Sequence, residues 1–138
     1  MDLVKKLLQA DTSKVNKKKK ATIKSKELAE IIGESEPTEI TITEIEQRSL
    51  NNILAMQVDE KGDYNFDKSF DAKLIMITEG VVDPPLRDED VLKHFGCKTS
   101  KDLAEKLFGS EITKISDAIG ELSGVNESDK EEIKIIKN

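Results

Sequence analysis

The residues best suited to chemistry in this sequence are its only histidine and its only cysteine, His94 and Cys97. They stand three positions apart, a spacing that metal ligands use. Zinc requires three or four protein ligands, and the chain offers no further histidine or cysteine. A nucleophilic mechanism would need the same histidine as its base, and the sequence identifies no partner for it. We therefore predict neither a metal site nor a catalytic site, and interpret both residues as structural.

A second group of candidate ligands, Asp63, Asn65 and Asp67, resembles the start of a calcium-binding loop. That pattern continues with a glycine and later a bidentate glutamate, but Lys68 and Leu74 stand at those places. The sequence also lacks a glycine-rich phosphate loop and the GxGxxG pattern. We predict that the protein is not an enzyme and has no cofactor, so its surface and its assembly must carry the function.

The composition is typical of a small helical domain with extended solvated faces. Of 138 residues, 36% are hydrophobic and 36% are charged, whereas globular domains average about 45–50% and about 25%. No stretch approaches the ~20 apolar residues of a membrane span, and the first residues lack the order of a signal peptide. A single cysteine excludes an internal disulfide. These features predict a cytosolic protein with no membrane partner.

Charge is divided unevenly along the chain. Residues 1–26 contain nine lysines and two aspartates, whereas residues 27–138 contain 13 basic and 26 acidic residues. Such asymmetry is found in nucleic-acid-binding arms. The segment Lys14–Lys26, however, has neither arginine nor aromatic residues, so it lacks groups that pair bidentately with bases or stack on them. A solvated basic linker with no nucleic-acid partner is favoured, and a small nucleic-acid-associated regulator is the alternative.

Residues that begin and end helices recur through the second half of the chain. Three segments each open with a capping residue and close before a glycine, which predicts three short helices in series: Asp88–Phe95, Thr99–Phe108 and Ser110–Ser123. The preceding segment, Phe66–Val82, is the most apolar and is predicted to be the central core helix. Its stripe comprises Phe66, Phe70, Leu74, Ile77 and Val81.

The first half mixes helix and strand signals. Ser25 and Gly33 predict a helix between them, and Thr43 with Glu46 forms a capping-box pattern for another helix. The alternation in residues 38–42 predicts a strand. This strand must pair, either with the extended residues 20–24 or with the same strand of another subunit. Near the end of the chain, Ser128 is a candidate cap for a last short helix.

These elements predict a mainly α fold, a compact single domain of about seven short helices. One or two short β-strands are expected near residues 20–24 and 38–42. We expect an N-terminal amphipathic helix over residues 1–10, a basic polar linker over residues 11–24, and a mostly helical globular domain over residues 25–138.

Two apolar surfaces are candidate partner-binding sites. The N-terminal helix is too short to be stable alone, so it must dock on its own body, on a sister subunit or on a partner. The seam near residues 112–122 has the narrow spacing suited to helix–helix packing. The candidate partner-binding residues are Leu3, Val4, Leu7, Leu8, Ile112, Ile115, Ile119 and Leu122.

The ordered pattern of the chain resembles a known family. The segment GVVDPPLRDEDVLKHFGCKTSKDLAEKLFGSEITKISDAIGELSG closely resembles the C-terminal half of the XkdN-like phage tail assembly chaperones. The opening residues 1–8, the strand and helix at residues 40–56 and the ending at residues 131–138 are similar too. One departure is the corner Phe108–Glu111, which is shorter and lacks an expected proline. The geometry of that turn is therefore open.

The resemblance implies a phage tail assembly chaperone of contractile-tail phages, prophages and phage-derived bacteriocins. Such a protein is expected to bind the tape measure protein, keep it soluble and help recruit tail tube protein subunits. It is expected in the cytoplasm of the bacterial host and not in the finished particle, and a homo-oligomer is possible. A structural component that stays in the tail is a further alternative.

Overall fold

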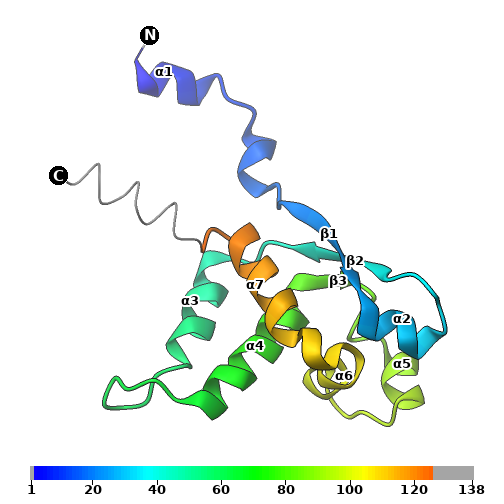
Figure 1. The fold of residues 1–138 in the computed structure, drawn as a ribbon. Helices are drawn as coiled ribbons and strands as arrows, with labels where there is room; N and C mark the ends of the chain where they lie inside the picture. The colour runs from blue at the N-terminus through cyan, green and yellow to red at the C-terminus, as the bar shows by residue number, and fades with distance from the viewer. Residues whose placement is uncertain (1, 126–138) are drawn as a thin grey trace.

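The computed structural model describes residues 2–125, and its helices gather around a small sheet (Figure 1). This arrangement confirms the predicted mainly α fold with some strands. The elements in chain order are α1 (Leu3–Leu8), a 3₁₀ turn (Thr12–Asn16), β1 (Lys20–Ser25), α2 (Lys26–Ile32), β2 (Thr38–Thr43), α3 (Gln47–Ala55), α4 (Phe66–Gly80), β3 (Val81–Asp83), α5 (Glu89–His94), α6 (Ser100–Phe108), a second 3₁₀ turn (Gly109–Glu111) and α7 (Ile112–Leu122).

The sheet is antiparallel, with the strand order β1-β2-β3. Within it, Ile23 lies opposite Ile40 and Ala21 lies opposite Ile42. The predicted pairing of residues 20–24 with residues 38–42 of the same chain is therefore confirmed. The segment 11–24, predicted to be a linker, contains a 3₁₀ turn and most of β1.

The third strand was not predicted. The helix expected over Phe66–Val82 ends at Gly80, because Val81 and Asp83 pair with β2 opposite Ile42 and Thr41. The apolar pattern continues through Val81 and Val82, so it does not mark the change from helix to strand. Tertiary pairing decides the boundary here, and the two prolines follow the strand rather than the helix.

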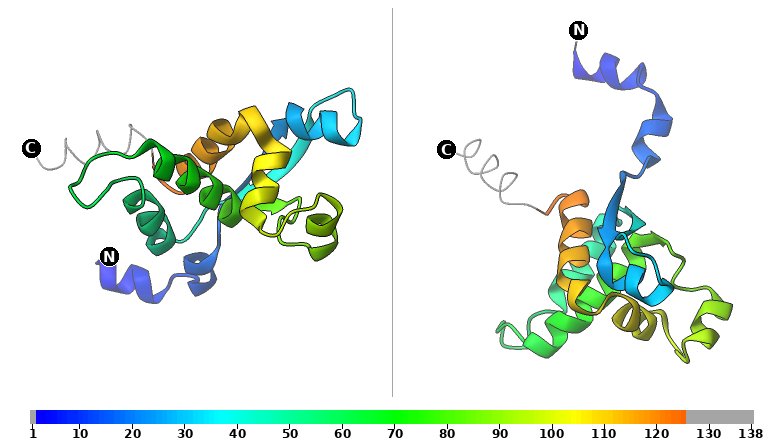
Figure 2. Two further views of the ribbon diagram at one scale, coloured as in Figure 1. Left: turned by 90° about the horizontal axis from the view of Figure 1, so that it is seen from below. Right: turned by 45° about the vertical axis from the view of Figure 1, so that its right-hand side comes forward.

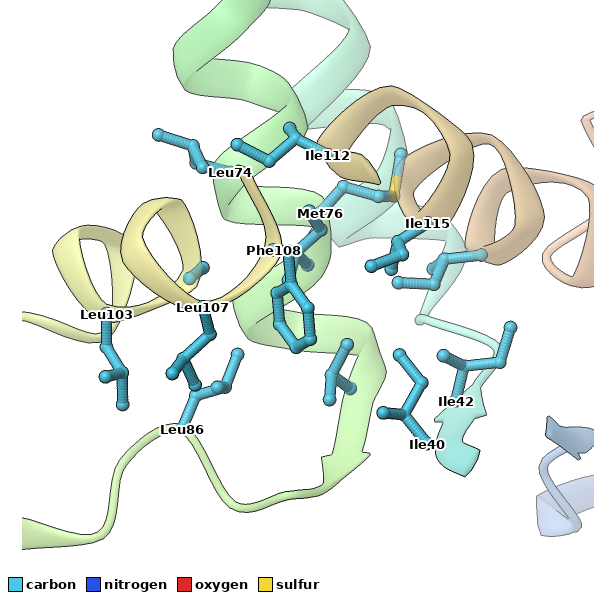
Figure 3. Packing of buried hydrophobic residues seen from close by; sticks show 14 of the residues in the cluster. Ile40, Ile42, Leu74, Met76, Leu86, Leu103, Leu107, Phe108, Ile112 and Ile115 are labelled. Carbon is cyan, nitrogen blue, oxygen red and sulfur yellow. The ribbon is translucent and has the colours of Figure 1, made fainter. Parts of the chain in front are cut away.

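The core lies between the sheet and the helices α4, α6 and α7 (Figure 3). The buried side chains of one cluster come from three elements around α4: Ile40 and Ile42 from β2, Leu103, Leu107 and Phe108 from α6, and Ile112 and Ile115 from α7. The C-terminal half of α4 is buried as predicted, including Leu74, Met76 and Ile77. The prediction is wrong for its N-terminal half, where Phe66 is 82% exposed and Phe70 is 41% exposed.

Several predicted helix ends are confirmed by the caps. The side chains of Ser25, Asp88 and Thr99 accept hydrogen bonds from the first turns of α2, α5 and α6. Gly33 ends α2 in the left-handed conformation, with φ of 80°. The helix predicted to end before Gly96 indeed stops at His94.

Two predicted helix starts are wrong. Thr43 does not cap α3 but ends β2, and its hydroxyl donates to the carbonyl of Lys19, so the helix begins only at Gln47. Ser110 does not cap α7, because Gly109–Glu111 form a 3₁₀ turn and the helix begins at Ile112. The helix predicted after Ser128 lies outside the described residues.

Candidate partner-binding surfaces

The N-terminal helix α1 stands away from the body of the molecule (Figures 1 and 2). Asp2 caps it by accepting a hydrogen bond from the amide of Lys5 at 2.9 Å. Its apolar side chains Leu3, Val4, Leu7 and Leu8 are between 65% and 82% exposed. Docking on the body was one expectation for this helix, and within residues 2–125 the structure shows it presented to solvent instead.

The second predicted surface is buried inside the chain. Ile112, Ile115 and Ile119 are at most 4% exposed, and Leu122 is half-buried against the same core. They fill the space between α7 and its neighbours α4 and the sheet. The narrow seam was correctly predicted to serve helix–helix packing, but the helix it packs against belongs to its own chain. The three isoleucines therefore offer almost no accessible surface in this conformation.

A surface that sequence reasoning missed lies where α3 and α4 meet. We call it the α3–α4 patch and define it by five exposed apolar residues: Leu54, Val58, Tyr64, Phe66 and Phe70. A backbone bridge joins Val58 to Tyr64, and the rings of Tyr64 and Phe66 meet edge to face with centroids 5.1 Å apart. The Tyr64 hydroxyl donates a hydrogen bond to the hydroxyl of Ser69. Phe70 follows Phe66 by one helical turn.

The patch was missed because its residues fit the periodicity of a buried helix. Phe66 and Phe70 stand at helical spacing before Leu74, and nothing in that spacing says where the neighbouring helices stop. The sequence does contain one sign of exposure: the polar residues Asp63, Asn65 and Asp67 alternate with Tyr64 and Phe66. Such interleaving is more typical of a solvent-facing helix start than of a core.

A polar cluster joins α2 to the turn before α7. One Glu111 oxygen accepts from the Ser25 hydroxyl at 2.6 Å and from the Glu27 amide at 3.2 Å, and the other accepts from the Lys26 amide at 3.1 Å. Burial raises the pKa of Glu111, but the hydrogen bonds from Ser25, Lys26, Glu27 and Lys114 outweigh it, so this pKa lies below its ordinary value. The carboxylate thereby caps the start of α2.

Gly109 belongs to the turn that positions this cluster. It has φ of 43°, and a Cβ there would lie 3.3 Å from a carboxylate oxygen of Glu27. The same Glu27 carboxylate accepts from the Ser110 hydroxyl at 2.6 Å. The corner Phe108–Glu111, whose geometry the sequence left open, is thus fixed by contacts with α2.

The two residues best suited to chemistry, His94 and Cys97, lie at the end of α5 and just after it. His94 is exposed in the last turn of α5 and meets the ring of Phe95 edge to face, and the half-buried Cys97 follows Gly96. In the loop between α3 and α4, where the residues that resemble the start of a calcium-binding loop begin, the Asp59 carboxylate accepts hydrogen bonds from the amides of Lys61 and Asp63. Among residues 2–125, no three histidine, cysteine or acidic side chains gather as a metal site requires. The helices of this part are also too short or too polar to span a membrane.

Comparison with known proteins identifies one family. The family model described as "Phage XkdN-like tail assembly chaperone protein, TAC" matches residues 4–137. No curated protein and no solved structure matches the chain. The match spans nearly the whole chain, from α1 through the core helices, and it confirms the resemblance seen in residues 80–124. The chain therefore belongs to the XkdN-like family of phage tail assembly chaperones.

Proposed function

We propose that this protein binds the tape measure protein in the cytoplasm of the host cell and keeps it soluble until the tail tube encloses it. In the same role it helps recruit tail tube subunits and leaves before the particle is finished. Membership of the tail assembly chaperone family supports the general role. A tape measure protein is long and helical, so its apolar stripes need cover before the tube forms around them.

The observation that carries this proposal is the exposure of α1. Four aliphatic side chains are held on one short helix with no described part of the body covering them. Burying one such side chain fully contributes about 1.5–3 kcal/mol, although ordering and association costs offset much of the sum. Docking of α1 against a client helix would thus be modest in affinity. Tube subunits must later displace the chaperone, and modest affinity suits that exchange.

The charge distribution supports the same role. Beyond residue 26 the chain carries twice as many acidic as basic residues, which keeps a complex with an apolar client in solution. Helix-in-groove docking uses anchors at positions i, i+3, i+4 and i+7. On α1, Val4, Leu7 and Leu8 stand at positions i, i+3 and i+4, and Leu3 stands one turn before Leu7.

The test is co-expression with the tape measure protein encoded by the same phage or prophage. The variant combines Leu3→Asp with Leu7→Asp, and the readout is the fraction of tape measure protein that stays soluble. We expect this fraction to fall severalfold, because two charges replace apolar anchors. The control is Val15→Asp, which places a single negative charge on an 85% exposed apolar side chain in the 3₁₀ turn that follows α1. The control should solubilise the client like the wild type.

Thermal unfolding separates binding from folding in this test. The melting temperature of the Leu3→Asp, Leu7→Asp variant should match that of the wild type, because the core lies between residues 28 and 119. A soluble fraction equal to that of the wild type would contradict the proposed role of α1. Recovery of the protein in purified, finished tails would instead favour a structural component of the tail.

A further inference from the structure

The α3–α4 patch is an apolar surface that the core does not use. Its five residues are at least 41% exposed, and three of them are aromatic. The bridge between Val58 and Tyr64 and the ring contact between Tyr64 and Phe66 join the two ends of the loop between α3 and α4 to the first residue of α4. Exposed aromatic side chains at one end of a small domain are typical of an interaction site.

Charge identifies the kind of partner that this patch accepts. Residues 58–71 contain five acidic side chains and two lysines, and Asp63 and Asp67 directly flank the aromatic residues. Residues 2–20 contain seven lysines and two aspartates, with Lys5 and Lys6 inside α1. An apolar helix bordered by lysines thus complements an apolar patch bordered by aspartates.

The spacing of the side chains also fits. On α1, Leu3 and Leu7 stand one turn apart, as do Val4 and Leu8. On α4, Phe66 and Phe70 stand one turn apart in the same way. Rows of side chains at this spacing pack into one another when two helices meet. Both surfaces therefore carry a row of exposed apolar side chains with the spacing that helix–helix packing uses.

The two surfaces of one chain do not meet. In Figure 1 and in the right-hand view of Figure 2, α1 lies at one end of the molecule and the loop between α3 and α4 lies at the other. We propose that α1 of one copy docks on the α3–α4 patch of a second copy. Each copy carries one α1 helix and one patch. Two copies can therefore exchange their α1 helices, or several copies can associate head to tail. This contact covers the same apolar side chains of α1 that the proposed function gives to the client, so self-association and client binding compete for one helix. The purified protein without client therefore tests self-association by itself.

Charge reversal tests the proposal in the purified full-length protein. One variant carries Lys5→Glu with Lys6→Glu, and the other carries Asp63→Lys with Asp67→Lys. Each places like charges on α1 and on the patch, so the Kd of self-association should rise about tenfold, given the energies of exposed ion pairs. Mixing the two variants restores opposite charges across the contact. Sedimentation velocity over a concentration series should therefore show association at about tenfold lower concentration in the mixture than in either variant alone.

A cysteine trap identifies the contact itself. In a Cys97→Ser background, Leu8→Cys and Phe66→Cys introduce thiols at two side chains that are each 82% exposed. Oxidation should give covalent dimers or larger species on a non-reducing gel. The control pairs Leu8→Cys with Ile32→Cys, whose side chain is 51% exposed at the end of α2. It should give several times less of the cross-linked product.

Several results would overturn the proposal. A monomeric wild type across the concentration series would do so, as would charge-reversed variants that associate like the wild type. Mixtures that fail to associate would exclude the assigned contact. A cysteine pair that closes within one chain, or that cross-links no better than the control, would place α1 elsewhere. Thermal unfolding of each variant alongside the wild type excludes misfolding as the cause of any loss.

Discussion

At the scale of single residues, Glu111 shows how one side chain joins segments far apart in the sequence. It accepts hydrogen bonds from the side chain of Ser25 and from the amides of Lys26 and Glu27. The sequence correctly predicted Ser25 as the cap of α2, because capping is a local pattern. It did not predict Glu111, since its partners stand 84 to 86 positions away and no local pattern relates them.

We predict that Glu111→Gln lowers the free energy of unfolding by about 1.5–3 kcal/mol at neutral pH, the range for hydrogen bonds to a charged group. The pKa of Glu111 in the folded protein lies below its ordinary value of 4.5. Its stabilising effect is therefore present above about that pH and is lost as the pH falls through the folded pKa.

Urea unfolding of both proteins between pH 7 and pH 3 checks this prediction. The difference between wild type and variant should be largest at neutral pH and shrink in acid. A difference that stays constant across this range would show that the charge of Glu111 is not what matters.

At the scale of elements, helices with strong local signals and the pair of strands β1 and β2 were predicted well, whereas β3 was not. The starts of α2, α5 and α6 follow from Ser25, Asp88 and Thr99. By contrast, β3 exists because Val81–Asp83 meets β2, and its three residues carry no strand pattern of their own. The start of α3 was misplaced because Thr43, a good cap by type, is already used by the sheet.

The contact between α4 and α7 supplies a second prediction at this scale. A Cβ at Gly80 would lie 2.6 Å from Cγ2 of Ile119, closer than side chains approach. Gly80→Ala should therefore cost about 1–3 kcal/mol of unfolding free energy, the usual penalty for overpacking. Adding Ile119→Ala, which removes the clashing atoms, should make the effect of Gly80→Ala much smaller than in the wild-type background.

Chemical denaturation of the four proteins in this double-mutant cycle measures the coupling. Additive effects of Gly80→Ala and Ile119→Ala would mean that the two helices do not approach as described.

Of the two apolar faces that the sequence offered as candidate partner-binding surfaces, the structure exposes one and buries most of the other, and the binding itself stays a prediction. The sequence identified α1 as an amphipathic helix too short to stand alone, and the structure places its apolar residues in solvent. The α7 seam has a similar apolar character but is buried, because α4 and the sheet lie against it. Periodicity identifies an apolar face, whereas only the arrangement of elements decides whether that face is covered.

At the scale of the whole molecule, a basic N-terminal arm precedes an acidic remainder. The lysines of this arm begin in α1, continue through the segment before β1 and enter the sheet at Lys20 and Lys24. This asymmetry suits contacts between copies or with a client more than recognition of bases. The arm between residues 2 and 26 carries no arginine or aromatic group to read a nucleic acid.

We predict that duplex DNA binds weakly and without sequence preference at ~0.15 M salt, because only lysine–phosphate contacts are available. Fluorescence anisotropy with two unrelated DNA sequences at two salt concentrations measures this. The variant Lys17→Gln, Lys18→Gln, Lys19→Gln should remove most of any residual binding at low salt. Tight binding that discriminates between the two sequences would instead support the nucleic-acid-associated alternative.

Site-specific photo-cross-linking tests most closely whether α1 contacts the tape measure protein directly, as we propose. A photoreactive amino acid replaces Leu8, which is 82% exposed on α1, or Ile32, which is 51% exposed on α2, in cells that also produce the tape measure protein. We predict a covalent adduct with the tape measure protein from position 8 and little or none from position 32. An adduct that forms equally from both positions, or from neither, would show that α1 is not the contact with the tape measure protein.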